Sequence, residues 1–169
     1  MRAWFIDQMA MYAAYHRDRR NKITHFVGVP MIVFSVMIIA WGVDLFSLGG
    51  ETINLAILLS AVLLLLYITI SPMVGLLLTI DFAILLWLSM LVSAKGGDVP
   101  LYSFLGLFIV GWIIQFWGHV FEGRKPALFD NLVQIFMAPF FLACEVVWAA
   151  GLQKSLKDEI EAETHKFET

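Results

Sequence analysis

The chain has 169 residues, of which 60% are hydrophobic and only 15% are charged. A soluble globular domain has about 45–50% apolar and about 25% charged residues, so the composition argues against a soluble domain and favours a membrane protein. The net charge of −3 argues against nucleic acid as a partner, and the single cysteine excludes an intramolecular disulfide.

Residues 1–22 are predicted to form a short amphipathic helix at the membrane interface. Apolar and aromatic side chains, including Phe5, Met9 and Tyr12, recur there at helical spacing. The segment ends in Arg-Asp-Arg-Arg-Asn-Lys, the largest basic cluster in the chain. It lacks the apolar core and cleavage site of a signal peptide, so we expect the first apolar span to act as an uncleaved insertion signal.

Five apolar segments follow, and a span of about 20 residues is enough to cross a hydrocarbon core of about 30 Å. The fifth segment contains Gln134, Pro139 and Glu145, so it is either a kinked span or a re-entrant or interfacial segment. We therefore predict an all-α, polytopic membrane helical bundle with four or five apolar segments. Residues 1–152 would form one integral-membrane domain, and residues 153–169 a soluble, charged tail. The predicted segments are 23–41, 53–70, 73–94, 101–119 and 132–152.

Basic residues in short loops predict the orientation of the spans. They are concentrated before the first span, and Arg124 and Lys125 follow the fourth. This distribution places the N-terminus and the loop at 121–131 on the cytoplasmic side. Four polar side chains from two distant parts of the chain would then meet at one membrane face: His16, His25, His119 and Glu122.

These four residues suggest a metal site. His119 and Glu122 are three residues apart, so a helix places them on one face, and Gln115 lies on that face one turn earlier. Histidine and carboxylate without thiolate suit iron, zinc, manganese or copper. Two histidines and one carboxylate are the ligands of non-haem Fe(II) oxygenases. The alternative is that His16 is an ordinary interfacial side chain and that Glu122 pairs with a nearby cation.

Two blocks of sequence resemble the 2-hydroxy fatty acid dioxygenase family, whose members are membrane proteins of fatty acid α-oxidation. The first is YAAYHRDRRNKITHFVGVP at 12–30, and the second is QFWGHVFEGRKPALFDNLVQIFMAPFF at 115–141. The resemblance implies an enzyme that uses Fe(II) and O2 to shorten a long-chain 2-hydroxy fatty acid by one carbon. Residues 1–152 would then be its catalytic domain.

The resemblance also implies roles for individual residues. His16, His25, His119 and Glu122 match the catalytic and metal-binding positions. The pair His16-Arg17 departs from the His-His that family members often carry, so any role of a second histidine is absent here or filled otherwise. We expect six further residues to bind substrate or to orient the ligands through hydrogen bonds. These are Tyr15, Asn21, Gln115, Arg124, Lys125 and Asp130.

Two other functions fit the same residues. A zinc-dependent lipid hydrolase would use zinc-bound water, with Glu122 as general base. A small transporter or scaffold would use His119, Glu122 and Asp81 as an ion relay. Membrane lipids are expected neighbours in every case. Short loops and the lack of a C-terminal retrieval motif favour a bacterial inner membrane over the endoplasmic reticulum.

Overall fold

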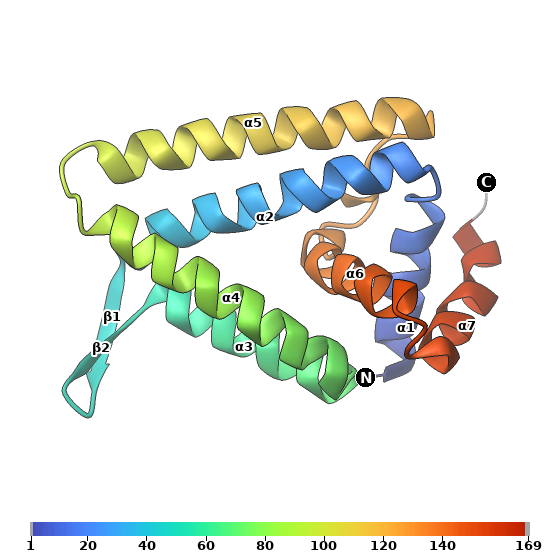
Figure 1. Cartoon of the computed structure of the whole chain (residues 1–169), viewed down its shortest axis with the longest axis horizontal. Coiled ribbons are helices and arrows are strands. Elements are labelled where there is room, and N and C mark those ends of the chain that lie inside the picture. The colour runs from blue at the N-terminus through green and yellow to red at the C-terminus, as the bar shows by residue number, and fades with distance from the viewer. Residues whose placement is uncertain (1, 168–169) are drawn as a thin grey trace. The chain divides into compact units, whose positions relative to one another are not determined.

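The computed structural model describes residues 2–167, most of which are helical (Figure 1). Clustering of contacts divides the chain into two compact units, residues 28–113 and residues 1–27 with 114–169. The helices are α1 (Arg2–Ala14), α2 (Arg19–Trp41), α3 (Leu55–Ile70), α4 (Pro72–Ser93), α5 (Val99–Glu122), α6 (Gln134–Ala149) and α7 (Lys154–Glu163). Short 3-10 turns are η1 (Ala127–Phe129) and η2 (Thr164–Phe167).

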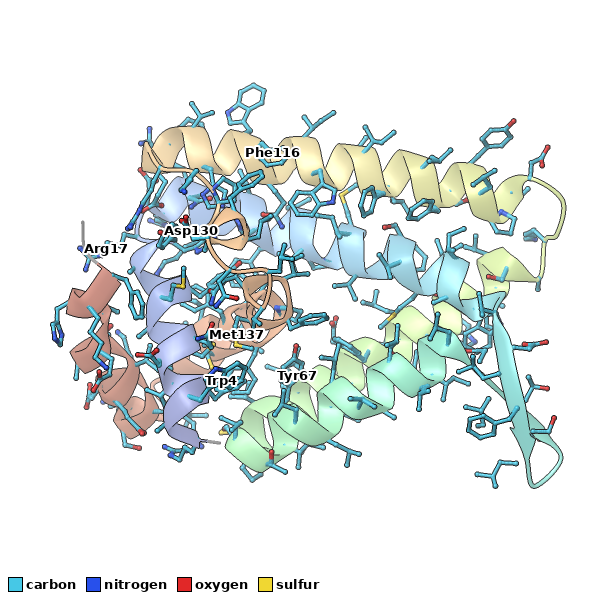
Figure 2. The ribbon with its side chains drawn as sticks, turned by 180° about the vertical axis from the view of Figure 1, so that it is seen from behind. Trp4, Arg17, Tyr67, Phe116, Asp130 and Met137 are labelled. Carbon is cyan, nitrogen blue, oxygen red and sulfur yellow. The ribbon has the colours of Figure 1, made fainter. Side chains whose placement is uncertain are left out.

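Three of the described helices, α2, α4 and α5, are long and apolar enough to cross a membrane. They have 23, 22 and 24 residues, whereas α3 and α6 have 16 each. The described residues thus contain three candidate spans, and the prediction of four or five spans is not confirmed. Large apolar side chains such as Ile109, Phe116 and Val120 stand exposed on α5, and Figure 2 labels Phe116 on this helix. Lipid-facing positions of a membrane helix have this character.

Residues 28–113 contain a β-hairpin that the all-α prediction missed. Strand β1 (Asp44–Leu48) pairs antiparallel with β2 (Glu51–Asn54). The connecting residues Gly49 and Gly50 have φ of 62° and 89°. Two consecutive positive φ angles are what a two-residue hairpin turn requires, and glycine adopts them without steric cost. The residues between the first two predicted apolar segments thus form a small two-stranded sheet.

Helices α3 and α4 lie side by side and are connected at Ser71-Pro72 (Figure 1). Ser71 ends α3 and caps α4, and Pro72 occupies the first turn of α4, where its missing N–H is tolerated. A Cβ on Gly75 would lie 2.6 Å from Ile68 Cγ1, so glycine permits the close approach of the two helices.

In the other unit, α1 packs against α6, α7 and η2. Phe5 and Met9 are fully buried, and the Phe5 ring meets Phe140 edge-on at 4.9 Å. Trp4 is half exposed, whereas Met137 is buried; Figure 2 labels both. Much of the apolar face assigned to the membrane interface is therefore covered by protein, and the interfacial position of α1 stays a prediction.

Helices α2 and α5 approach closely near the ends that belong to this unit. A Cβ on Gly118 would lie 2.0 Å from Thr24 Oγ1 and 2.5 Å from Asn21 Oδ1. Any larger residue would force the two helices apart. Because His119 follows Gly118 directly and His25 follows Thr24, this contact brings the two histidines together.

Candidate metal centre

Three histidines from three different segments form one buried cluster. His16, His25 and His119 are 3%, 4% and 6% exposed. Their ring centroids are 4.4, 4.9 and 5.1 Å apart, and one nitrogen of each ring lies within 4.8 Å of the others. The predicted convergence of these residues is present, although 94 residues separate His25 from His119 in the chain.

Local structure fixes each imidazole. His16 follows the end of α1, where its ring stacks on Tyr12 with a centroid distance of 3.9 Å and an interplanar angle of 6°. His25 lies in the second turn of α2, and His119 in the last turn of α5. The three histidines were predicted from the sequence as site residues, but Tyr12 was not. The spacing of four residues between Tyr12 and His16 was the sequence signal that could have identified this contact.

Hydrogen bonds settle the tautomers of two rings. His16 Nδ1 lies 2.7 Å from the Tyr12 carbonyl oxygen, and His25 Nδ1 lies 2.9 Å from the Asn21 carbonyl oxygen. A carbonyl oxygen only accepts, so both Nδ1 atoms carry the proton and both Nε2 atoms present a lone pair in the neutral rings. Metal-binding histidines are oriented by the same kind of bond from the other ring nitrogen.

The two Nε2 atoms face each other across 3.0 Å. Two neutral nitrogens with lone pairs repel at this distance unless a cation lies between or beside them. His119 adds a third unsatisfied nitrogen, because its buried Nδ1 has no hydrogen-bond partner among residues 2–167. The cluster thus offers three imidazole nitrogens and no thiolate, which fits a transition metal such as iron, zinc or copper.

Electrostatics favours the ligand form of His16. Burial holds the pKa of its imidazole well below the usual range, and the neighbouring His25 lowers it further. The hydrogen bond to the Tyr12 carbonyl opposes this shift. At neutral pH the ring is therefore uncharged, and its Nε2 is available to a metal without prior loss of a proton.

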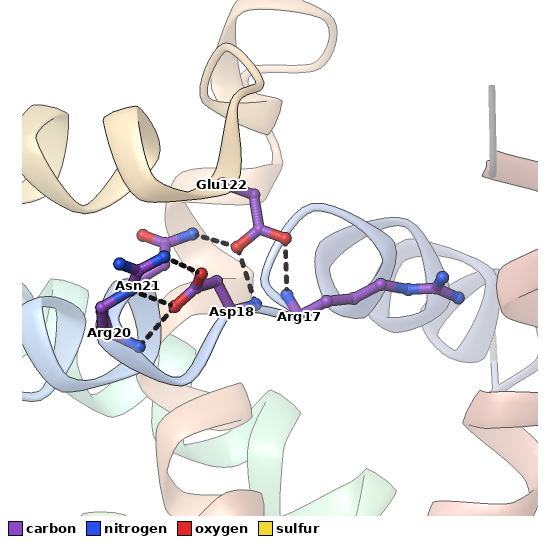
Figure 3. Close-up of polar contacts among 5 residues, drawn as sticks. All are labelled: Arg17, Asp18, Arg20, Asn21 and Glu122. Carbon is purple, nitrogen blue, oxygen red and sulfur yellow. Dashed lines mark hydrogen bonds and ion pairs between the residues drawn. The ribbon is translucent and has the colours of Figure 1, made fainter.

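The Glu122 carboxylate contacts backbone and amide donors, as Figure 3 shows. Its Oε1 accepts from the Arg17 backbone N–H at 2.9 Å, and its Oε2 from the Asp18 N–H at 3.0 Å. The Asn21 side-chain amide also donates to Oε2, at 2.9 Å. The three ligand atoms found within 4.8 Å of one another come from the histidines alone. Glu122 thus ties down the turn between His16 and His25.

Four of the predicted neighbours form a separate polar cluster. The Tyr15 hydroxyl donates to Asp130 at 2.8 Å, and Lys125 pairs with the same carboxylate. These two contacts keep the pKa of Asp130 below its usual range, with the Lys125 hydrogen bond as the larger cause. The Arg124 guanidinium lies 3.6 Å from the Tyr15 ring centroid and donates to the carbonyls of Ala14 and Phe167. These contacts join the end of α1 to the loop around η1 and to η2.

The other two predicted neighbours lie closer to the ligands in the chain. Asn21 is fully buried, and its backbone carbonyl accepts from His25. Gln115 is 5% exposed, and its Oε1 is buried without a hydrogen-bond partner among the described residues. Sequence reasoning missed the ion pair between Lys22 and Glu145, whose Nζ and Oε1 are 2.6 Å apart. The two residues are 123 positions apart, so no periodic pattern in the sequence connects them.

Buried histidines beside membrane-length helices define the class of site as a candidate metal centre of a membrane protein. The family described as "2-hydroxy-palmitic acid dioxygenase Mpo1-like" matches residues 3–150. The chain is also 36% identical over 157 residues to the 2-hydroxy-palmitic acid dioxygenase MPO1 of Saccharomyces cerevisiae. The aligned region covers 92% of this chain and 86% of the yeast protein. No solved structure matches.

The chain therefore belongs to the Mpo1-like family, as the resemblance of its two sequence blocks predicted. Both blocks lie inside the matched region, and together they contain all three clustered histidines.

Proposed function

We propose that the protein is an Fe(II)-dependent dioxygenase that converts a long-chain 2-hydroxy fatty acid and O2 into a fatty acid one carbon shorter. The observation that carries the proposal is the pair of Nε2 lone pairs 3.0 Å apart, joined by His119, in a chain of this family. The yeast relative is named for its action on 2-hydroxy-palmitic acid, which gives the substrate class.

The overall reaction balances without a further reductant. A 2-hydroxy acid, RCH(OH)COOH, and O2 yield RCOOH, CO2 and H2O. The bond between C1 and C2 breaks, C2 becomes the new carboxyl carbon and C1 leaves as CO2. The substrate loses four electrons and O2 gains four. Bound iron would supply the redox chemistry that O2 requires and that amino-acid side chains lack.

Residues of the chain would bind the metal and orient its ligands. His16, His25 and His119 would be the ligands, and three ligands leave coordination positions for oxygen donors. The Tyr12 and Asn21 carbonyls keep the Nε2 lone pairs of two rings directed into the cluster. All three rings are buried, which limits the access of bulk water to the ligand nitrogens.

For Glu122 we propose a positioning role in place of the predicted ligand role. Its carboxylate accepts three hydrogen bonds from residues 17–21, and these bonds fix the turn that connects His16 to the helix carrying His25. A negative charge at the start of α2 is also favourable for the helix dipole. The cytoplasmic orientation of the site stays a prediction from the loop charges. A bacterial host membrane stays a prediction from the short loops and the lack of a retrieval motif.

Mass spectrometry tests the proposed function. Purified protein is incubated with 2-hydroxypalmitate, Fe(II) and O2, and the expected product is the saturated acid one carbon shorter. A folded, iron-loaded protein that forms no such acid would contradict the proposal. Full activity with zinc and no O2 uptake would instead support the hydrolase alternative.

A further inference from the structure

A cavity of about 350 Å³ lies beside the histidine cluster, within the unit formed by the two ends of the chain. His16 forms part of its wall, together with Lys22 from α2 and Phe141 and Glu145 from α6. Ligand-binding cavities range from roughly 300 to 1,000 Å³, so this cavity has room for the polar end of a lipid and the first part of its chain.

Lys22 places a cation in this wall. It lies one helical turn before His25, on the same side of α2. Its Nζ is 2.6 Å from Glu145 Oε1 and 5.7 Å from the centre of the Phe141 ring, so it is held against two other wall residues.

The charged side chains in the cavity wall are compatible with the binding of an anion. Its wall contains two cations, Arg17 and Lys22, and two acids, Glu145 and Glu161. Glu145 is paired with Lys22, and Glu161 is mostly exposed and lies 3.5 Å from Lys157, which is outside the wall. An ammonium has three donors, so Lys22 can bind an incoming carboxylate while it keeps its bond to Glu145.

We infer that the cavity binds the carboxylate end of the substrate acid and that Lys22 is the residue that recognises it. The inference rests on the proposed function and deepens it. A carboxylate held by Lys22 lies next to His16, so C1 and the hydroxyl on C2 are presented to the metal centre. Phe141 and Ile160 supply apolar wall for the first methylenes of the chain. Glu145 positions Lys22 and competes with the substrate for its charge.

The test compares the binding of 2-hydroxypalmitate and of its methyl ester to Fe(II)-loaded protein without O2, so that no turnover occurs. Binding is followed by calorimetry in detergent, and metal content and melting temperature are measured for every variant. We expect the wild-type protein to prefer the acid. In Lys22→Met/Glu145→Gln, which removes both charges together, the preference should fall by about tenfold or more, as for loss of a hydrogen bond to a charged group.

Glu145→Gln alone should have the opposite effect. It removes the competing anion and keeps Lys22, so the acid should bind more tightly while the ester is unaffected. A purely structural ion pair predicts no such gain. The control is Lys166→Met, which removes a lysine that pairs with Asp7 and Glu163 outside the cavity wall. Its acid preference should equal that of the wild type.

An unchanged acid preference in the double variant, or no gain in Glu145→Gln, would overturn the role of Lys22. If the double variant does not fold, the single Glu145→Gln variant decides. The inference and the proposed function fail in different ways. Wild-type protein that prefers the acid but forms no shortened product would support the carboxylate site and contradict the dioxygenase. Product formation with an unchanged acid preference in the double variant would contradict the carboxylate site alone.

Discussion

At the scale of single residues, the site depends on where each imidazole carries its proton. The Tyr12 and Asn21 carbonyls each accept a hydrogen bond from an Nδ1 atom, so two Nε2 lone pairs meet at 3.0 Å. This arrangement is unfavourable in a purely structural core, because buried polar atoms are normally paired with complementary partners. It is favourable once a metal cation accepts both lone pairs.

Replacing His119 with alanine should remove the metal. The variant loses one of three imidazole ligands, so metal affinity should fall by more than the roughly 10–100-fold that loss of an outer hydrogen-bond partner costs. Metal content after purification and dialysis measures this. The control is His165→Ala, because His165 is exposed, lies outside the histidine cluster and hydrogen-bonds to the carbonyl of Ala162. Equal metal loss in both variants would contradict the assignment.

Replacing Glu122 tests whether its carboxylate positions the histidine ligands or binds the metal itself. In Glu122→Ala the backbone donors of Arg17 and Asp18 lose their acceptor, which should destabilise the protein by about 1–3 kcal/mol and weaken metal binding about tenfold. The absorption spectrum of bound Co(II) should keep its band positions at saturating metal, because the ligands are unchanged. A shifted spectrum would show that the carboxylate is itself a ligand.

At the scale of elements, the centre depends on how closely α2 and α5 approach. Gly118 is the residue that allows it, because a Cβ there would lie 2.0 Å from Thr24 Oγ1. Sequence inspection sees Gly118 as one more glycine in an apolar helix. Only the contact with Thr24 and Asn21 explains why a larger residue is excluded at this position.

Gly118→Ala should therefore separate the histidines. Overpacking of this kind typically costs about 1–3 kcal/mol, and metal affinity should fall with it because His25 and His119 move apart. Thermal denaturation in detergent and metal titration measure the two effects. The matched control is Gly106→Ala in the same helix, where a Cβ would meet nothing within 4 Å. That change should be neutral or stabilise α5 by up to about 1 kcal/mol. Similar losses in both variants would contradict the packing argument.

At the scale of the whole molecule, the sequence predicted the parts of the site that follow from topology. Four predicted crossings between His25 and His119 would return the chain to one membrane face, and on this basis the histidines were predicted to converge. The described helices include three candidate spans, so this count of crossings stays a prediction. The apolar runs likewise predicted the long helices. The role of Glu122 was harder to predict, because the donors of its hydrogen bonds lie more than 100 positions away, at residues 17–21. The pair of Lys22 and Glu145 was missed for the same reason.

The C-terminal segment makes contacts that the sequence analysis did not predict. It was predicted to be a soluble, charged tail, and its helix α7 buries Leu156 and Ile160 and packs against α1. The missed hairpin at 44–54 had a local signal in Gly49-Gly50, a dipeptide typical of two-residue hairpin turns. The C-terminal segment had only a weak signal. Leu156 and Ile160 are four residues apart on one face of a helix, but this spacing does not indicate which surface covers them.

If α7 is part of the folded unit, truncating its buried side chain should destabilise the protein. Leu156 is 3% exposed, so Leu156→Ala should cost about 2–5 kcal/mol. Leu152 is 45% exposed, and Leu152→Ala should have little effect. Melting temperatures of the two variants give the comparison. A Leu156→Ala variant as stable as Leu152→Ala would mean that the C-terminal helix contributes nothing to the unit.

The most direct test of the central claim is the ratio of O2 consumed to shortened acid formed by iron-loaded protein. An oxygen electrode and mass spectrometry follow one reaction of 2-hydroxypalmitate in parallel. We expect one O2 to be consumed per molecule of the acid one carbon shorter, without added reductant, and neither O2 uptake nor product for His119→Ala. Product formed without O2 uptake, or unimpaired turnover in His119→Ala, would contradict the assignment of the three histidines to an oxygen-activating iron centre.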